Sequence, residues 1–328
     1  MRYVVLGAGA VGGVVGGLLA RAGTDVTLVA RGPHLDAVRR DGLLVVRGDE
    51  EWRVDVPAVP DASEAGLDAA GTVLVLAVKS QHTAAALEPL LPLPVDLPVV
   101  CLQNGVANER LLLRHSARVH GVCVMLPCAH LEPGTVRLFS LGRPGILDVG
   151  RAAGGVDQVD RAVAGDLVGA GFLSEPRGDV MAWKHRKLLM NLGNGVDAAC
   201  GDGEAAAELV ARCRAEGEEV LAAAGVAVTS AEDDRARRAE HLRPLARDDG
   251  VGSSTWQSLQ RAGGAGGTTE ADHLNGEIVL RARLLGRRAP YNEVVQRAVA
   301  ELARAGGRPR SLDAAGLLST AESARLRT

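Results

Sequence analysis

Apolar and polar positions divide this chain into a strand-rich part and a helix-rich part. Short apolar runs predict strands, separated by helical or loop segments, at residues 2–6, 25–30, 71–79, 96–104 and 118–126. Strands that alternate with helices predict a parallel, doubly wound sheet in an α/β fold. After about residue 175 this pattern stops, and longer helices are predicted at residues 181–197, 204–224, 232–245, 271–285 and 291–305.

The change of pattern predicts two domains. A chain of 328 residues suits two domains of about 150 residues each. The stretch "SEPRGDV" lies where strands give way to helices. We therefore expect a doubly wound α/β domain at residues 1–176 and an all-α domain at residues 177–328.

Composition excludes several classes of protein. The net charge is −3 and aromatic residues make up 2% of the chain, which argues against a nucleic-acid partner. Five cysteines without a CxxC pair do not indicate a disulfide framework or a zinc site, and they fit a reducing cytoplasm. The apolar stretch "YVVLGAGAVGGVVGGLLA" contains six glycines, so we expect neither a signal peptide nor a membrane span.

A glycine pattern follows the first predicted strand directly. Gly7, Gly9 and Gly12 have GxGxxG spacing, with Ala8, Ala10 and Val11 between them, and a helical segment follows. The first glycine permits the tight turn, the second admits a pyrophosphate, and the third allows close packing of the helix. Strand, glycines and helix in this order predict a dinucleotide site, whereas the alternative is a glycine-rich packed turn.

The end of the second predicted strand bears on the choice of cofactor. NAD-binding units usually place an acidic residue there, but this chain has Ala30 and Arg31, and an arginine suits the 2′-phosphate of NADP(H). The alternative is an ordinary surface arginine. Lys79 and Asn104 end two other predicted strands, so they should face the same crevice, although each could be a turn residue.

A polar stripe lies within an otherwise apolar helical segment. Lys187, Asn191 and Asn194 are spaced i, i+4 and i+7, which predicts a single helix face. The chain has only three lysines, and a lysine can release a proton whereas an arginine cannot. We therefore interpret Lys187 as a candidate proton donor, with an ion pair to a carboxylate as the alternative.

Further polar residues follow in "GSSTWQSLQRAGGAGGTTEADHLNG". Ser254 and Glu270 are candidates for a site here, although Glu270 taken alone is more typical of a helix cap. The histidines show no metal-ligand spacing, and there is no nucleophile-elbow motif. The sequence thus predicts neither a metal nor a covalent hydrolytic site.

Eight segments together resemble the 2-dehydropantoate 2-reductases, or ketopantoate reductases: "GAGAVGG", "VTLVARG", "LAVKSQ", "LQNGV", "RKLLMN", "GSSTWQ", "TEADHLNG" and "APYNEV". The resemblance implies a Rossmann domain joined to a helical domain like that of 6-phosphogluconate dehydrogenases, with the active site in the cleft between them. It also implies a place in pantothenate biosynthesis.

The resemblance assigns roles to individual residues. Those that would contact NADPH are Gly7, Ala8, Gly9, Ala10, Val11, Gly12, Arg31, Lys79, Asn104, Ala129 and Glu270. Those that would contact the substrate are Asn104, Lys187, Asn191, Asn194 and Ser254. Lys187 matches the general acid, and Glu270 matches the acidic residue that holds substrate and cofactor together.

Three departures from the family pattern lie around the substrate. An asparagine normally follows the lysine by eight residues, but Gly195 stands there and Asn194 precedes it. Ser258 replaces an acid, and a glycine-rich insertion occupies residues 262–267. These departures argue against ketopantoate as the substrate more than against NADPH-dependent reduction as the reaction.

The sequence thus predicts cytoplasmic, NADPH-dependent reduction of a small 2-oxo acid, foremost 2-dehydropantoate to pantoate. Two alternatives stay open: a reductase of another oxo acid or ketone, and a non-catalytic NADPH sensor. The oligomeric state is also open, with a homodimer among the options.

Overall fold

The computed structural model describes residues 1–68, 70–239, 241–245, 252–262 and 267–326. The chain forms two compact units, the first of Met1–Lys184 and Thr229–Arg247, the second of His185–Val228 and Asp248–Thr328. The first unit therefore extends to Lys184 rather than to residue 176. It also includes Thr229–Arg247, which we expected in the helical domain.

Seven strands form the main sheet of the first unit, in the order β12-β8-β7-β6-β1-β2-β5. They are β1 (Arg2–Leu6), β2 (Asp25–Val29), β5 (Ala58–Val59), β6 (Thr72–Leu76), β7 (Val99–Cys101), β8 (Val119–Met125) and β12 (Ile146–Arg151). All neighbours are parallel except β12, which runs antiparallel to β8. The predicted doubly wound parallel sheet is thus confirmed.

Alternate residues of β1 face opposite sides of this sheet, because side chains in a strand alternate. Tyr3 and Val5 belong to one apolar core, and Val4 and Leu6 belong to the other. The first core takes residues from α1 (Ala10–Arg21), α2 (Gly32–Asp41) and α5 (Gln158–Gly169). The second takes residues from η1 (Ala62–Ala65), α3 (Thr83–Leu87), η3 (Glu88–Leu90) and α4 (Ala107–Leu112).

A second, four-stranded sheet was not predicted. Its order is β4-β3-β10-β9, with β3 (Leu43–Arg47), β4 (Glu50–Val54), β9 (Cys128–Ala129) and β10 (Thr135–Leu138). The apolar run "LLVV" before Gly48 was the available signal for β3. The strands β9 and β10 are two and four residues long, which is too short to show a clear alternation.

Helix α1 is lined with glycine where it meets both sheets. A Cβ at Gly16 would lie 2.5 Å from Leu28 Cδ2 of the main sheet, and one at Gly17 would lie 2.9 Å from Leu43 Cδ2 of the second sheet. Gly12 and Gly13 stand one turn earlier on the same two faces, since residues four apart share a helix face. Alanine at these positions would push the helix away from its neighbours.

The segment from Thr229 onward returns to the first unit through a helix and a strand. Helix α9 (Ala231–Ala239) is followed by β13 (Leu242–Pro244), which pairs antiparallel with β11 (Ser140–Gly142). The prediction of one helix over residues 232–245 was therefore wrong beyond Ala239. The pairing with β11 is distant in sequence, so local pattern could not reveal it.

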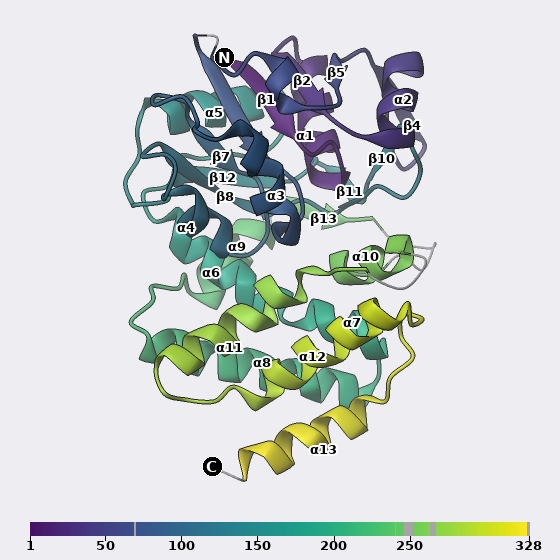
Figure 1. Ribbon diagram of the computed structural model, residues 1–328, viewed down its shortest axis with the longest axis vertical. Coiled ribbons are helices and arrows are strands. Elements are labelled where there is room, and N and C mark those ends of the chain that lie inside the picture. The colour runs from purple at the N-terminus through teal and green to yellow at the C-terminus, as the bar shows by residue number, and fades with distance from the viewer. Residues whose placement is uncertain (69, 240, 246–251, 263–266, 327–328) are drawn as a thin grey trace. The chain divides into compact units, whose positions relative to one another are not determined.

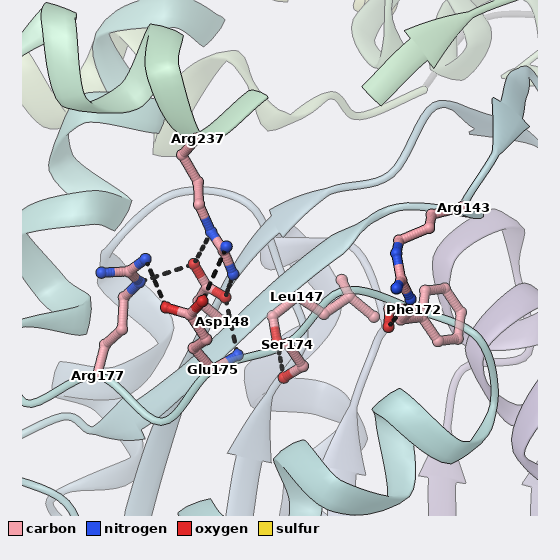
Figure 2. Close-up of polar contacts among 8 residues, drawn as sticks. All are labelled: Arg143, Leu147, Asp148, Phe172, Ser174, Glu175, Arg177 and Arg237. Carbon is pink, nitrogen blue, oxygen red and sulfur yellow. Dashed lines mark hydrogen bonds and ion pairs between the residues drawn. The ribbon is translucent and has the colours of Figure 1, made fainter. Parts of the chain in front are cut away.

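Arg237 of α9 fixes this segment to the sheet. Asp148 of β12 is buried, with its oxygens 2.7 Å from Arg177 Nε and 2.7 Å from Arg237 Nη2. Figure 2 shows this carboxylate between the two guanidinium groups, with Glu175 beside them. Glu175 pairs with both arginines, at 3.1 Å and 3.0 Å. A buried charge with several charge-assisted bonds resists separation, so residues 229–247 belong with the first unit.

Helices make up the second unit (Figure 1). They are the end of α6 (Val180–Asn191), then α7 (Gly193–Cys200), α8 (Glu204–Ala223), α10 (Ser254–Ala262), η4 (Glu270–His273), α11 (Asn275–Leu284), α12 (Pro290–Ala305) and α13 (Ala314–Arg325). The predicted helix 181–197 is interrupted at Leu192, where α7 begins anew. Within the described residues, every helix is too short or too polar to cross a membrane.

Candidate active site

The glycine loop joins β1 to α1 and is held by the neighbouring strand. Gly7 has φ +107°, and a Cβ there would lie 2.7 Å from Val78 N, so only glycine fits. The N–H groups of Gly7 and Ala8 both donate to Val29 O, at 3.2 Å and 3.1 Å. The loop is therefore a fixed turn.

The start of α1 suits an anion. No side chain caps the helix at Gly9, and no acidic residue occupies its first turn. A Cβ at Gly9 would meet no atom within 4 Å, which leaves open space beside the loop. The positive end of the helix dipole and its free N–H groups attract negative charge there. These residues fit the pyrophosphate of a dinucleotide.

Three further candidates follow strands of the main sheet. Arg31 is exposed and precedes the first residue of α2, just after β2. Lys79 precedes η2 (Ser80–His82), and Asn104 follows β7. The hydroxyl of Ser80 donates to Asn104 O at 3.5 Å, so the loops that carry Lys79 and Asn104 are joined. The carboxyl ends of the parallel strands thus bring these loops to one edge, as predicted.

Ala129 is placed less favourably for a ligand. It lies in β9 and is 1% exposed, which leaves little of the residue to meet a cofactor. Its predicted contact rests on the resemblance alone.

Lys184 has a role that the sequence did not reveal. Its ammonium group is buried and forms an ion pair with Glu109 Oε1 at 2.9 Å. It also donates to Gln103 O at 2.7 Å and to Val122 O at 3.0 Å. The ammonium group is thus held by two backbone carbonyls and one carboxylate. Because Gln103 precedes Asn104, Lys184 fixes the base of the loop that carries Asn104.

The predicted polar stripe lies in the second unit. Lys187 is half-buried on α6, one turn before Asn191 at the end of that helix. Asn191 is 6% exposed, and its Nδ2 has no hydrogen-bond partner within the described part of the chain. Leaving a buried donor without an acceptor costs about 1–3 kcal/mol. Such a donor suggests a ligand that supplies the acceptor.

Asn194 does not continue the stripe on the same helix, because Leu192 interrupts it. It lies on α7, and its amide nitrogen is 3.4 Å from Ser254 Oγ of α10. Two of the predicted substrate residues are therefore neighbours, although they are 60 residues apart in sequence. Ser258 stands where the family pattern has an acid, and its hydroxyl donates to Ser254 O at 3.0 Å within α10.

Packing explains why the asparagine stands at 194. A Cβ on Gly195 would lie 2.6 Å from Val295 Cγ1 and 3.1 Å from Asn275 Oδ1. A side chain at 195 would thus collide with α12. Glycine at 195, where the family pattern has an asparagine, therefore fits the close packing around α7.

Glu270 is 3% exposed and opens the short helix η4. The cap is Thr269, whose hydroxyl accepts from Ala271 N at 3.4 Å. Residues 263–266 of the glycine-rich insertion lie outside the described residues.

One cluster brings together groups that could ligate a metal. His120 Nδ1 lies 2.7 Å from Asp160 Oδ1, and Asp157 Oδ2 lies 4.0 Å from His120 Nε2. These residues are distant in sequence, so spacing did not reveal them. Asp157 and Asp160 already form the capping box of α5, accepting from each other's backbone N–H. Capping of the helix accounts for both carboxylates.

Known proteins resemble this chain over most of its length. The family model "Ketopantoate reductase PanE/ApbA" matches residues 3–154, and the model of the C-terminal part of that family matches residues 179–303. A 2-dehydropantoate 2-reductase of Halobacterium salinarum is 34% identical, over 86% of this chain and 92% of its own length.

Solved structures share the fold. A PanE/ApbA family ketopantoate reductase from Ralstonia eutropha JMP134 is 30% identical with a TM-score of 0.76, over 92% of this chain and 98% of its own. A D-mandelate dehydrogenase solved with NADH and anilino(oxo)acetate has a TM-score of 0.77, over 91% of this chain and 97% of its own. At 22% identity the second likeness concerns the fold alone.

Two glycine variants should separate binding from folding. Gly9→Ala should keep the melting temperature, since its Cβ has open space, but lower the affinity for a nicotinamide dinucleotide at least about tenfold by obstructing the anion. Gly12→Ala should instead lower the melting temperature, because its Cβ would collide with Gly7 O and Ala77. Calorimetry and fluorescence titration check both. Unchanged affinity in Gly9→Ala would place the dinucleotide elsewhere.

Proposed function

This chain belongs to the ketopantoate reductase family, and from that premise we propose that it reduces a small 2-oxo acid with NADPH, foremost 2-dehydropantoate to pantoate. The glycine loop and the start of α1 support a dinucleotide, and Arg31 supports NADP(H) over NAD(H). The buried, unpartnered amide of Asn191, one turn from Lys187, is the observation that carries the substrate part.

A bound nicotinamide cofactor supplies the hydride that the carbonyl carbon of the substrate accepts. The N–H groups of Gly9 and of the first turn of α1 would hold the pyrophosphate, since those of Gly7 and Ala8 donate to Val29 O. Arg31 pairs with a 2′-phosphate, for which a guanidinium offers two parallel donors. The loops of Lys79 and Asn104 border the same edge of the sheet.

Lys187 is the proposed general acid. Its ammonium group donates a hydrogen bond to the carbonyl oxygen, stabilises the negative charge that grows there, and then gives up a proton. A lysine can complete this last step because it loses a proton far more readily than an arginine. This explains a lysine at 187 in a chain whose other basic residues are almost all arginines.

The remaining polar groups complement an oxo acid. A 2-oxo acid presents only acceptors at its reacting end, namely a carbonyl oxygen and a carboxylate. Asn191, Asn194 and Ser254 offer N–H and O–H donors, which can bind those oxygens and hold the carbonyl in reach. Glu270 would bind a hydroxyl of the substrate or cofactor, because an ionised carboxylate only accepts.

A different oxo acid or ketone remains the second candidate, since Ser258 bonds to its own helix where the family pattern has an acid.

A substrate panel tests the proposed reaction. Purified protein with NADPH should consume the cofactor fastest with 2-dehydropantoate, compared with pyruvate, 2-oxoisovalerate, phenylglyoxylate and simple ketones, as followed by absorbance at about 340 nm. Faster turnover of another compound would support the second candidate. Tight binding of NADPH without turnover of any compound would indicate a sensor instead of an enzyme.

Arg31→Ala should change the choice of cofactor. Loss of a charge-assisted bond should weaken NADPH binding about tenfold or more and leave NADH binding within about twofold. Arg40→Ala is a matched control, because Arg40 is exposed on the same helix and pairs with Asp41. Equal effects of Arg31→Ala on both cofactors would contradict the assignment of the 2′-phosphate.

Lys187→Ala should lower kcat about 10² or more with little change in NADPH affinity, because a positioned acid contributes about that much. Lys187→Arg keeps the charge but retains its proton, so it should also be slow. Steady-state kinetics with a calorimetric cofactor titration measures both effects. A kcat near that of the natural protein in Lys187→Ala would refute the acid role.

A further inference from the structure

His34 links the glycine loop to a turn of the second sheet. It lies on α2 and is 9% exposed. Its Nε2 is 2.8 Å from Ala8 O, in the loop between Gly7 and Gly9. Its Nδ1 is 2.9 Å from Gly134 N, just before β10. Both ring nitrogens are therefore bonded to backbone atoms, although neither partner is near in sequence.

These two bonds fix the protonation state of the ring. The backbone N–H of Gly134 can only donate, so Nδ1 must accept and carry no proton. Nε2 then carries the proton and donates it to Ala8 O. Burial lowers the pKa of His34 below its ordinary 6.5, which is consistent with a neutral ring.

The surroundings hold the ring in place. The ring of His130 lies against it, with centroids 4.2 Å apart. Gly134 has φ +77°, and a Cβ there would lie 2.8 Å from Ala37 Cβ, so its turn is pressed against α2. His34 therefore has a rigid support on the side away from Ala8.

The bond to Ala8 O bears on the anion site through peptide geometry. In a planar trans peptide, the C=O of one residue and the N–H of the next point in opposite directions. Holding the carbonyl of Ala8 toward His34 therefore turns the N–H of Gly9 the other way. Gly9 is the glycine with open space beside it, where the loop fits a pyrophosphate.

We propose that neutral His34 is a positioning residue for the cofactor: its Nε2–H holds the Ala8 carbonyl so that the Gly9 N–H meets the pyrophosphate. This proposal about His34 rests on the proposed function only for the identity of the dinucleotide. His34 touches the loop and not the reacting atoms, so its loss should affect cofactor affinity and leave kcat at saturating cofactor within about twofold.

Acid should break the bond to Gly134 N–H, which holds the ring in place against Ala8. A protonated ring places an N–H on Nδ1 opposite the N–H of Gly134, and two donors cannot bond. Since burial lowers the pKa of His34 below 6.5, affinity is retained at pH 6.5 and above, and it falls only as the pH drops through this lowered pKa. Other titratable or charged groups lie on the elements packed around the ring. They are Arg31, Asp36, Arg39, Arg40 and Asp41 on or next to α2, and His130, Glu132 and Arg137 on the β9–β10 turn and β10.

Two variants separate the two bonds of the ring. The amide nitrogen of a glutamine can occupy the place of Nε2, whereas the amide oxygen of an asparagine can occupy that of Nδ1. His34→Gln should therefore keep NADPH affinity within about threefold, whereas His34→Asn should lose about tenfold. Fluorescence titration of NADPH, with melting temperatures of both variants, measures this. Equal losses in both variants would overturn the proposal.

The pH profile of affinity gives a test that needs no loss of binding at neutral pH. Between pH 5 and 8, the natural protein should lose NADPH affinity in acid, and His34→Gln should keep a flatter profile. His115→Gln, at an exposed histidine, should behave as the natural protein does. An acid limb as steep in His34→Gln as in the natural protein would overturn the proposal.

Failure of the proposed reaction would be distinguishable, because every readout here is binding. A protein that binds NADPH but reduces no oxo acid would contradict the reaction and leave these results interpretable. A protein that binds no NADPH at any pH would overturn the role of His34 directly.

Discussion

Close approach of α1 to the layers on both of its sides is the constraint on which the first unit depends. Glycine pairs four residues apart form two smooth faces on one helix, one for each sheet. Each glycine costs about 1 kcal/mol relative to alanine within a helix. Packing of α1 against the strands must therefore stabilise the fold by more than this cost. Since only Gly7–Gly9 separate β1 from the helix, the same packing that closes the core also fixes the N–H groups of the anion site.

Two of the three lysines stand on α6, each for a different physical reason. Lys184 is buried against three acceptors, and a compact ammonium has three donors to satisfy them, whereas a guanidinium would bring five. Lys187 stands one turn later and is half-buried, and its proposed role as general acid needs a group that can give up its proton. An arginine would serve neither purpose, which is why both positions depart from the composition of the chain.

Local signals were enough for the main features of the fold, and distant contacts decided the rest. The strand, the glycines and the helix at residues 2–21 are contiguous, so their spacing predicted the loop. Strand β13 forms only because β11 lies beside it, and no pattern near residue 242 indicates that. His34 and Gly134 are 100 residues apart, so the bond between them depends on the second sheet, which was not predicted. Lys184 was visible as a rare lysine, but its carboxylate partner was not.

The substrate end of the candidate site shows how packing can preserve chemistry while changing spacing. Helix α6 ends at Asn191 and α7 begins at Gly193, with Leu192 between them, so Asn194 stands in the first turn of a second helix. Contact with Val295 excludes a side chain at 195, and the amide at 194 reaches Ser254 instead. The donors of the proposed substrate site are thereby kept, and the shift changes the position of one amide relative to the others.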